Sequence, residues 1–342
     1  MPQYYLGVDI GSSKTHALIA DDRGNALGFG CCGAGNHEVV GYTGLEKALL
    51  ETTQQALAMS GLKVTQIAGA GFGVAGYDWP SERPATLQSI AALSLCCPFE
   101  AVNDVDIGLI AGTVEGWGIV IDAGSGNNVH GRTPDGQIAG ITGNGGRFGE
   151  YGGSAELVSR ALIAISYEWT GRGPATQLTP AFIQYVGARD ISDFLEGLVL
   201  DRYLLSNQMA PLVFEVAAAG DTVAQEVITW NSRELGYSAV GIIRKLGFQN
   251  LDFEVVLIGS MFNGGRLATE PMQRIIWAEA PRAHFVHLNC PPVVGGVLLG
   301  MQAAGCIAPD SIRSSVHPRL VESANRLFQS AGTPASTGSS PL

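Results

Sequence analysis

Residues 6–15 read LGVDIGSSKT, and residues 118–127 read GIVIDAGSGN. Each stretch is an apolar strand that ends in Asp-x-Gly and turns through small residues, and each is followed by two more predicted strands around a polar turn. Such a turn exposes several backbone N–H groups at one point, and a nest of this kind binds phosphate without a cationic side chain. The repeat therefore predicts two related α/β units that contact one phosphate chain from both sides.

Length and charge narrow the function classes. A chain of 342 residues is long enough for two domains that each bury a core. The formal net charge of −11 argues against a nucleic-acid surface, because binding to a phosphate backbone needs clustered Lys and Arg. No apolar run reaches the roughly 18 residues of a membrane span, and the start lacks the basic residues of a signal peptide. We therefore expect no nucleic-acid or membrane partner and a cytoplasmic location.

The cysteines do not predict a metal site. Two adjacent pairs and two single residues make up the set: Cys31, Cys32, Cys96, Cys97, Cys290 and Cys306. Adjacent cysteines are poorly spaced for tetrahedral zinc, and the chain has no Cys-x-x-Cys pattern. We expect buried thiols in a reducing compartment.

The hydrophobic periodicity predicts an α/β order in both halves. In the first half it predicts helices over residues 45–60 and 84–95 and strands over 66–74 and 99–102. In the second half it predicts helical structure from 154 to 169 and, with interruptions, to 246, then strands at 253–258 and 283–288 and helices at 269–280 and 293–304.

The domain prediction places a boundary near Gly112. Residues 1–112 are expected to form the first domain and residues 113–304 the second, with a helix over about 305–328 packing back on the first. Residues 331–342 are low in complexity and are predicted to be a disordered tail.

Five segments carry a resemblance to a known family: residues 9–15, 33–37, 102–104, 123–128 and 145–154. In this order they resemble the BadF/BadG/BcrA/BcrD ATPase family of the sugar kinase, chaperone ATPase and actin superfamily. The chain up to about residue 305 is most similar to its N-acetylglucosamine kinase and glucosamine kinase members. The resemblance implies two ribonuclease H-like (actin-like ATPase) domains, α/β in class, with a nucleotide and sugar cleft between them.

The first segment, DIGSSKT, is similar to the family's first phosphate loop. The resemblance implies that Asp9 holds Mg²⁺, directly or through water, and that the loop contacts the phosphates of ATP. The expected contacts are Gly11, Ser12, Ser13, Lys14 and Thr15. Two alternatives stay open: Asp9 caps the turn, or Lys14 is an ordinary surface lysine.

Two further segments imply sugar contacts. Residues 33–37 (GAGNH) resemble a loop in which an asparagine, here Asn36, binds sugar hydroxyls; the alternative is an Asn that caps the next helix. Residues 102–104 (VND) resemble the family's Thr-Asp-Ala, which makes Asp104 the expected catalytic base for the sugar hydroxyl. Asp106 is a weaker rival, and a strand-end aspartate without chemistry is the remaining alternative.

Residues 123–128 (AGSGNN) are similar to the second phosphate loop, which in this family also lies against the sugar. The resemblance implies contacts from Gly124, Ser125, Gly126 and Asn127. Asp122 stands where the family has an apolar residue. It either reaches the hydration shell of Mg²⁺ or caps the turn, and the sequence does not separate these two interpretations.

Residues 145–154 (GGRFGEYGGS) resemble a family segment whose acidic residue binds sugar hydroxyls, which implies Gly146 and Glu150 as ligands. Arg147 stands at a tryptophan position, so the exact sugar and its N-acetylation stay open. Residues 257–262 (LIGSMF) resemble the adenosine motif and imply that Gly259 and Ser260 lie beside adenine, because a glycine lets the ring approach the backbone. Gly295-Gly296 is either the family's closing helix or a helix-packing pair.

Together the resemblance implies an ATP- and Mg²⁺-dependent kinase for an amino sugar, first of all N-acetylglucosamine at its 6-hydroxyl, with a homodimer as a possible assembly. The alternatives are a glucosamine kinase, an ATPase that activates a 2-hydroxyacyl-CoA dehydratase-like enzyme, and a non-catalytic ATP or sugar sensor. Residues 71–76 (GFGVAG) also fit the dinucleotide pattern Gly-x-Gly-x-x-Gly, but YDWP follows instead of a helix, so this interpretation is weaker.

Overall fold

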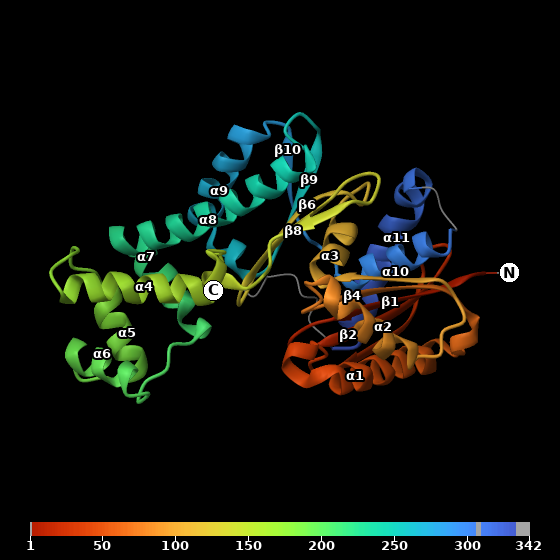
Figure 1. Ribbon diagram of the computed structural model, residues 1–342, viewed down its shortest axis with the longest axis horizontal. Coiled ribbons are helices and arrows are strands. Elements are labelled where there is room, and N and C mark those ends of the chain that lie inside the picture. Colours follow the sequence, from red (N-terminus) through yellow and green to blue (C-terminus); the bar gives the residue numbers. More distant parts are fainter. Residues whose placement is uncertain (1, 306–308, 333–342) are drawn as a thin grey trace.

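The computed structural model describes residues 2–305 and 309–332. Within them lie two five-stranded sheets with the orders β3-β2-β1-β4-β5 and β8-β7-β6-β9-β10 (Figure 1). In each sheet three strands form an antiparallel meander, and two later strands add in parallel beside the first. The repeat in the sequence is thus a repeat in topology, and the predicted α/β fold is confirmed.

The first sheet comprises β1 (Tyr4–Ile10), β2 (Thr15–Asp21), β3 (Ala26–Cys32), β4 (Ile67–Val74) and β5 (Phe99–Asn103). Helices α1 (His37–Ser60), α2 (Arg83–Ala91) and α3 (Asp104–Gly112) accompany it, with the short 3₁₀ turns η1 (Val64–Gln66) and η2 (Pro80–Glu82). We call this unit, with the two C-terminal helices described below, the first lobe.

The second sheet comprises β6 (Gly118–Ala123), β7 (Asn127–Arg132), β8 (Ile138–Gly140), β9 (Phe253–Ile258) and β10 (Ala283–His287). Between β8 and β9 the chain forms η3 (Gly145–Phe148), α4 (Ser154–Trp169), α5 (Leu178–Val186), α6 (Ile191–Val199), η4 (Asn207–Met209), α7 (Ala210–Ala218) and α8 (Thr222–Leu246). After β9 come η5 (Ser260–Gly264) and α9 (Arg266–Glu279). These elements share one apolar core, and we call them the second lobe.

Two helices return to the first lobe after β10. The helix α10 (Val293–Ala303) packs on β1, β4 and α3, and α11 (Pro309–Ser330) packs beside it (Figure 1). Leu320 and Phe328 of α11 are buried in the same apolar cluster as Tyr5 and Leu18. Because α10 contributes its apolar face to the first sheet, we propose to count it with the first lobe, although its position in the sequence had placed it in the second half.

Glycines allow α10 to approach the first sheet closely. A Cβ added to Gly7 of β1 would lie 2.4 Å from the backbone nitrogen of Val297, and one added to Gly295 would lie 1.8 Å from the backbone oxygen of Ile107. Gly71, the first residue of the dinucleotide-like pattern, contacts α10 in the same way. Close helix packing therefore accounts for Gly295 and for Gly71, while Gly73 of the same pattern packs against Ile107 of α3.

Replacing Gly295 with Ala is expected to destabilise the fold. Overpacking a tight contact costs about 1–3 kcal/mol or more, which outweighs the 0.5–1 kcal/mol that Ala ordinarily gains over Gly in a helix. Gly241→Ala in α8 is the matched control, because a Cβ there meets nothing within 4 Å. Thermal unfolding should show a lower Tm for Gly295→Ala and an equal or higher Tm for the control. Equal Tm values for both variants would contradict this packing.

The structure differs from several of the sequence predictions. The apolar helix α3 was not predicted, α1 begins at His37 and is kinked at Gly41, and α2 ends at Ala91. The expectation of buried thiols holds for Cys290, whereas Cys96 is exposed and Cys31, Cys32 and Cys97 are half-buried. Cys306 and most of the predicted tail, residues 333–342, lie outside the described residues. None of the helices in the described part of the chain is long and apolar enough to cross a membrane.

Candidate nucleotide and sugar site

Three aspartates lie at the strand ends where the two lobes face each other. Asp9 is the second-last residue of β1 and Asp122 the second-last residue of β6, each two residues before the glycine of its turn, while Asp104 begins α3. The strand registers match, because Asp9 pairs with His16 on β2 and Asp122 pairs with Asn128 on β7. The two carboxylates therefore occupy equivalent places in the two lobes.

These carboxylates influence one another across the lobes. Burial and then repulsion by Asp122 raise the pKa of Asp9 to about 7, and burial raises the pKa of Asp122 to about 7. Burial, Asp9 and Asp122 together raise the pKa of Asp104 well above its usual range, although His130 acts in the opposite direction. Desolvation and like charge both disfavour a carboxylate anion, and His130 offsets these two effects on Asp104 only in part.

A divalent cation fits this donor set. Carboxylate oxygens suit Mg²⁺, which is usually held by one or two carboxylates together with substrate phosphates and water. Among the described residues no three His, Cys, Asp or Glu side chains gather closely enough to enclose a metal by themselves. The arrangement therefore fits a cation shared with a phosphate ligand better than a closed protein cage.

The first turn is tight and presents its small residues to solvent. The Gly11 amide donates to the Lys14 carbonyl at 2.9 Å, and the amides of Gly35 and Asn36 donate to the Gly11 carbonyl at 3.0 and 3.2 Å. Ser12, Ser13 and Lys14 are exposed, as a phosphate contact requires.

Thr15 differs from the rest of this turn. Its side chain is fully buried, and its hydroxyl would lie 2.6 Å from a Cβ placed on Gly35. The hydroxyl therefore packs beneath the turn, and we remove the Thr15 side chain from the expected phosphate contacts.

The second turn rests on the first turn of α4. Gly124 donates to the Gly126 carbonyl at 2.9 Å, and Ser154 and Ala155 donate to the carbonyls of Gly124 and Ser125 at 2.9 and 3.1 Å. Ser125 and Gly126 are exposed. A turn anchored in this way keeps its geometry when a ligand approaches.

Asn127 follows the second turn and is only 7% exposed. Among the described residues, neither its amide oxygen nor its amide nitrogen has a hydrogen-bond partner. An unpaired buried polar group costs about 1–3 kcal/mol. A ligand that offers both a donor and an acceptor would satisfy this amide.

Asn36 caps the N-terminus of α1, which was the alternative to a sugar contact. Its Oδ1 accepts from the Glu38 amide at 2.9 Å, and its Nδ2 donates to the Ser12 hydroxyl at 3.0 Å. The side chain thus connects α1 to the first phosphate turn. A sugar contact by Asn36 would have to replace or share one of these bonds.

Asp104 and Asp106 have different surroundings, although both lie in the first turn of α3. Asn103 caps this helix, accepting from the Val105 amide at 3.0 Å, and donates to Asp78 at 2.8 Å. Asp106 is 2% exposed and lies 2.9 Å from Nδ1 of His130. Asp106 is therefore committed to His130, which leaves Asp104 as the carboxylate available to a ligand.

Glu150 organises its own loop. Its carboxylate accepts from the Thr142 amide at 2.8 Å, the Thr142 hydroxyl at 2.9 Å and the Asn144 amide at 3.1 Å. Gly146 and Arg147 are exposed nearby, and the Arg147 guanidinium lies 5.9 Å from the Phe148 ring centroid. A sugar bound by Glu150 would therefore share a carboxylate that already has three donors.

The fold itself requires a glycine at position 259, apart from any contact with adenine. Its φ is 103°, and a Cβ there would lie 2.3 Å from the backbone oxygen of Ala123. The glycine is therefore required by the close approach of β6 and β9, whether or not a ring lies beside it. Ser260, which follows, is exposed.

Three residues were missed by the sequence argument: Glu38, Asp78 and His130. Asp78 accepts a hydrogen bond from Asn103 at 2.8 Å, and burial and then Glu38 raise its pKa to about 6. Asp78 lies in the loop after β4, and ligands in α/β sheets bind at the carboxyl ends of strands, so its position carried a usable signal. His130 lies inside a strand and carried none.

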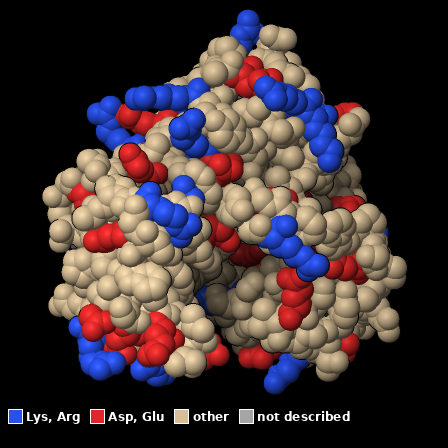
Figure 2. Space-filling model, turned by 60° about the vertical axis from the view of Figure 1, so that its left-hand side comes forward, with Lys and Arg blue, Asp and Glu red and all other residues tan. Residues whose placement is uncertain are grey.

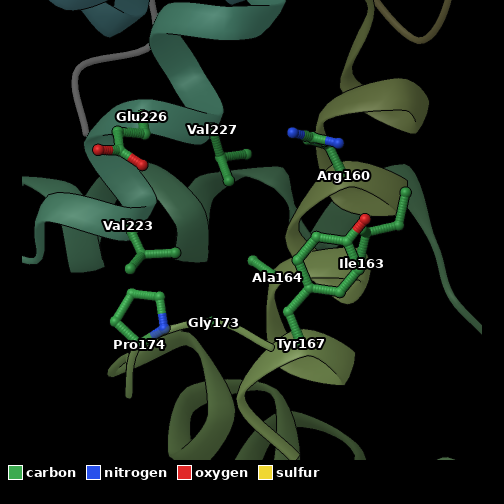
Figure 3. Close-up of a pocket in the computed structure, with 9 residues that line it drawn as sticks. All are labelled: Arg160, Ile163, Ala164, Tyr167, Gly173, Pro174, Val223, Glu226 and Val227. Atoms are coloured by element: carbon green, nitrogen blue, oxygen red, sulfur yellow. The ribbon is translucent and has the colours of Figure 1, made fainter. Parts of the chain in front are cut away.

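Figure 2 shows a hollow in the surface near the centre of the lower half of the view. Acidic side chains lie at its upper end. A separate cavity of about 130 Å³ lies between α4 and α8 (Figure 3). Arg160 and Tyr167 line it from α4 and Glu226 from α8, and Gly173 and Pro174 close one end. None of the predicted site residues lines this second cavity, so its volume does not mark the site.

The duplicated sheet, with a small-residue turn and an aspartate at each facing strand end, places the chain among two-lobed proteins of the actin-like ATPase fold. The chain belongs to the BadF/BadG/BcrA/BcrD ATPase family, whose sequence profile matches residues 6–300. The predicted family is thus confirmed, and its name implies that ATP is used.

The chain matches two kinases over nearly the whole length of each. The chain is 22% identical over 300 residues to the N-acetylmuramic acid/N-acetylglucosamine kinase of Clostridium acetobutylicum, covering 87% of this chain and 98% of that one. It is 22% identical over 315 residues to the N-acetyl-D-glucosamine kinase of Dictyostelium discoideum, covering 88% and 98%. A crystal structure of a provisionally named N-acetylglucosamine kinase from Chromobacterium violaceum has a TM-score of 0.63 at 23% identity, covering 87% and 98%, and it supports the fold.

Proposed function

We propose that this protein is an ATP-dependent kinase that phosphorylates an amino sugar, in the first place N-acetylglucosamine at its 6-hydroxyl. The observation that carries the proposal is the placement of Asp104 between two equivalent phosphate-type turns, within electrostatic reach of Asp9 and Asp122. The two named relatives, both kinases of N-acetylated sugars, support the choice of acceptor.

In this proposal Asp104 orients the sugar hydroxyl and accepts its proton as the phosphoryl group transfers. Mg²⁺ would be held by Asp9, with Asp122 as a further ligand, and would neutralise phosphate charge. The positive charge also favours the carboxylate form of Asp104, which its present surroundings oppose. Asp104 would thus become a competent base only when the nucleotide and its cation are bound.

The remaining residues position the two substrates. The amides and hydroxyls of Gly11, Ser12, Ser13, Ser125 and Gly126, with Lys14, would contact the phosphates, and Gly259 and Ser260 would lie near adenine. Asn127 would satisfy its unpaired amide on a ligand, and Gly124, Gly146, Glu150 and Asn36 would border the sugar. Catalysis would come mainly from positioning and charge neutralisation.

Glucosamine is the second candidate acceptor, and Glu38 and Asp78 favour it. Asp78 accepts a hydrogen bond from Asn103, the residue directly before Asp104 in the chain, and Glu38 repels Asp78. An ammonium group on the sugar would relieve this repulsion, whereas an N-acetyl group would not. The same residues disfavour an acceptor with its own carboxylate.

The test is ADP release in the presence of Mg²⁺-ATP and each of N-acetylglucosamine, glucosamine, N-acetylmannosamine, glucose and no sugar. Turnover that depends on N-acetylglucosamine supports the first proposal, and a preference for glucosamine supports the role of Glu38 and Asp78. A Glu38→Gln variant should then lose that preference. Sugar-independent hydrolysis would point to an ATPase activator, and no turnover with any sugar would point to a sensor.

A further inference from the structure

A buried ion pair joins the two lobes next to the proposed base. His130 belongs to β7 of the second lobe and Asp106 to α3 of the first, and their Nδ1 and Oδ1 atoms are 2.9 Å apart. The side chains are buried, with exposures of 7% for His130 and 2% for Asp106. Because α3 begins at Asp104, this pair holds the helical turn that carries the base.

The second lobe provides space for the histidine ring. His130 pairs with Gly140 of β8, and a Cβ on Gly140 would lie 2.4 Å from the His130 ring. Arg132, two residues further along β7 and so on the same face, donates to the Gly116 carbonyl at 2.9 Å, and its charge also acts on Asp106. This face of β7 therefore presents two basic side chains toward α3.

Apolar side chains also join the two lobes at α3. Val105 and Leu109 of α3 pack against Val120 of β6 and Val256 of β9 in a small buried cluster. Figure 1 shows α3 between the two sheets. Replacing a buried ion pair by apolar residues is often neutral or stabilising, so stability alone is weak grounds for a charged pair at this position.

The pair of His130 and Asp106 also affects the pKa of Asp104, through the charges around that carboxylate. Asp9 from β1, Asp122 from β6 and Asp78 from the segment after β4 all raise the pKa of Asp104, whereas His130 from β7 lowers it. Burial opposes the charged form of His130, but Asp106, Asp104 and Asp78 outweigh it and raise its pKa. His130 is thus the group that acts on Asp104 in the opposite direction to these carboxylates.

We propose that His130 is a positioning residue for phosphoryl transfer: through Asp106 it fixes the first turn of α3, which carries Asp104. The inference rests on the proposed function and adds a second-lobe residue that acts on a first-lobe base. If it holds, Asp104 is active only when the two lobes are in contact at α3.

The test compares wild type with His130→Gln, Asp106→Asn and the double variant, using the best sugar from the acceptor panel. His130→Gln should lower kcat by about 10- to 100-fold, since misplacing a reacting group by about 1 Å can cost 10²-fold. The KM for ATP should change little. The acidic limb of the pH profile should move to higher pH, because removing a nearby cation raises the pKa of a carboxylate. The double variant should lose little more than either single one, because the two residues act as one unit.

Leu109→Val is the structural control. It loosens the apolar contact of α3 without changing charge, so it should lower Tm and leave the acidic limb in place. An NMR titration of the imidazole adds a readout that does not need activity: the pKa of His130 should be lower in Asp106→Asn than in wild type. An unmoved acidic limb in His130→Gln, or the same imidazole titration in both proteins, would overturn the inference while leaving the kinase assignment intact. A wild type that is inactive with every sugar would overturn both.

Discussion

Replacing Asp104 with Asn is expected to lower kcat by about 10² to 10⁴, the range for loss of a general base or acid. The physical reason is that an amide can still accept a hydrogen bond from the sugar hydroxyl but cannot accept its proton. Binding of Mg²⁺-ATP should be retained, because Asp104 lies at the start of α3 and not in either phosphate turn. Coupled ADP release gives kcat, and calorimetry gives the nucleotide affinity.

Asp252→Asn is a suitable control for this variant. Asp252 directly precedes β9, at the opposite end of that strand from Gly259, and forms an exposed pair with His284 at 3.0 Å. Its replacement should leave kcat unchanged. If Asp104→Asn kept near-normal turnover, the assignment of the base would be wrong and Asp78 would become the next carboxylate to examine.

Asp9→Asn is expected to separate activity from stability. Turnover should fall by about 10² or more, the cost of losing one group that stabilises charge in the transition state, and more Mg²⁺ should be needed for the remaining activity. The ligand-free protein should nevertheless unfold at a higher temperature at about pH 8, because the variant removes a half-buried charge that Asp122 repels. Thermal unfolding without nucleotide or metal measures the second effect.

The pH dependence follows from the direction of the shifts. The folded pKa of Asp9 and of Asp122 is raised from 3.8 to about 7, so both groups destabilise the folded state when ionised. The wild-type Tm without ligands should therefore rise as pH falls from about 8 toward 5.5, where the folded state takes up protons and the unfolded state does not. The rise should be smaller in Asp9→Asn. Identical pH profiles for the two proteins would contradict the coupling of these carboxylates.

Much of the fold was predictable because its determinants are local. The strand that ends in Asp-x-Gly occurs twice, and the topology repeats with it. The strand Phe253–Ile258 and the helix Ser154–Trp169 were predicted to the residue, because apolar runs and clear periodicity mark them. The helix α3 was missed because seven of its nine residues are buried, so it has no polar face to give a helical period.

The site residues that lie at strand ends and turns were predictable from the sequence. The surroundings of the other site residues were less so, because contacts between distant segments determine them. Asp9, Asp104 and Asp122 do lie at facing strand ends, and strand boundaries indicate such positions. The burial of Thr15, the cap formed by Asn36 and the three donors on Glu150 depend on segments that meet only in the fold. The pair of His130 and Asp106 joins residues of different lobes, so neither residue's local sequence indicates it.

The most direct test of the account follows the phosphorus atom itself. ³¹P NMR of wild-type protein with Mg²⁺-ATP and N-acetylglucosamine, and separately with glucosamine, shows whether ADP and a sugar 6-phosphate appear together. The account predicts equal amounts of both products with at least one of these sugars, and formation of both at least about 10²-fold more slowly with Asp104→Asn. Inorganic phosphate in place of sugar phosphate, or equal sugar phosphate from wild type and Asp104→Asn, would contradict it.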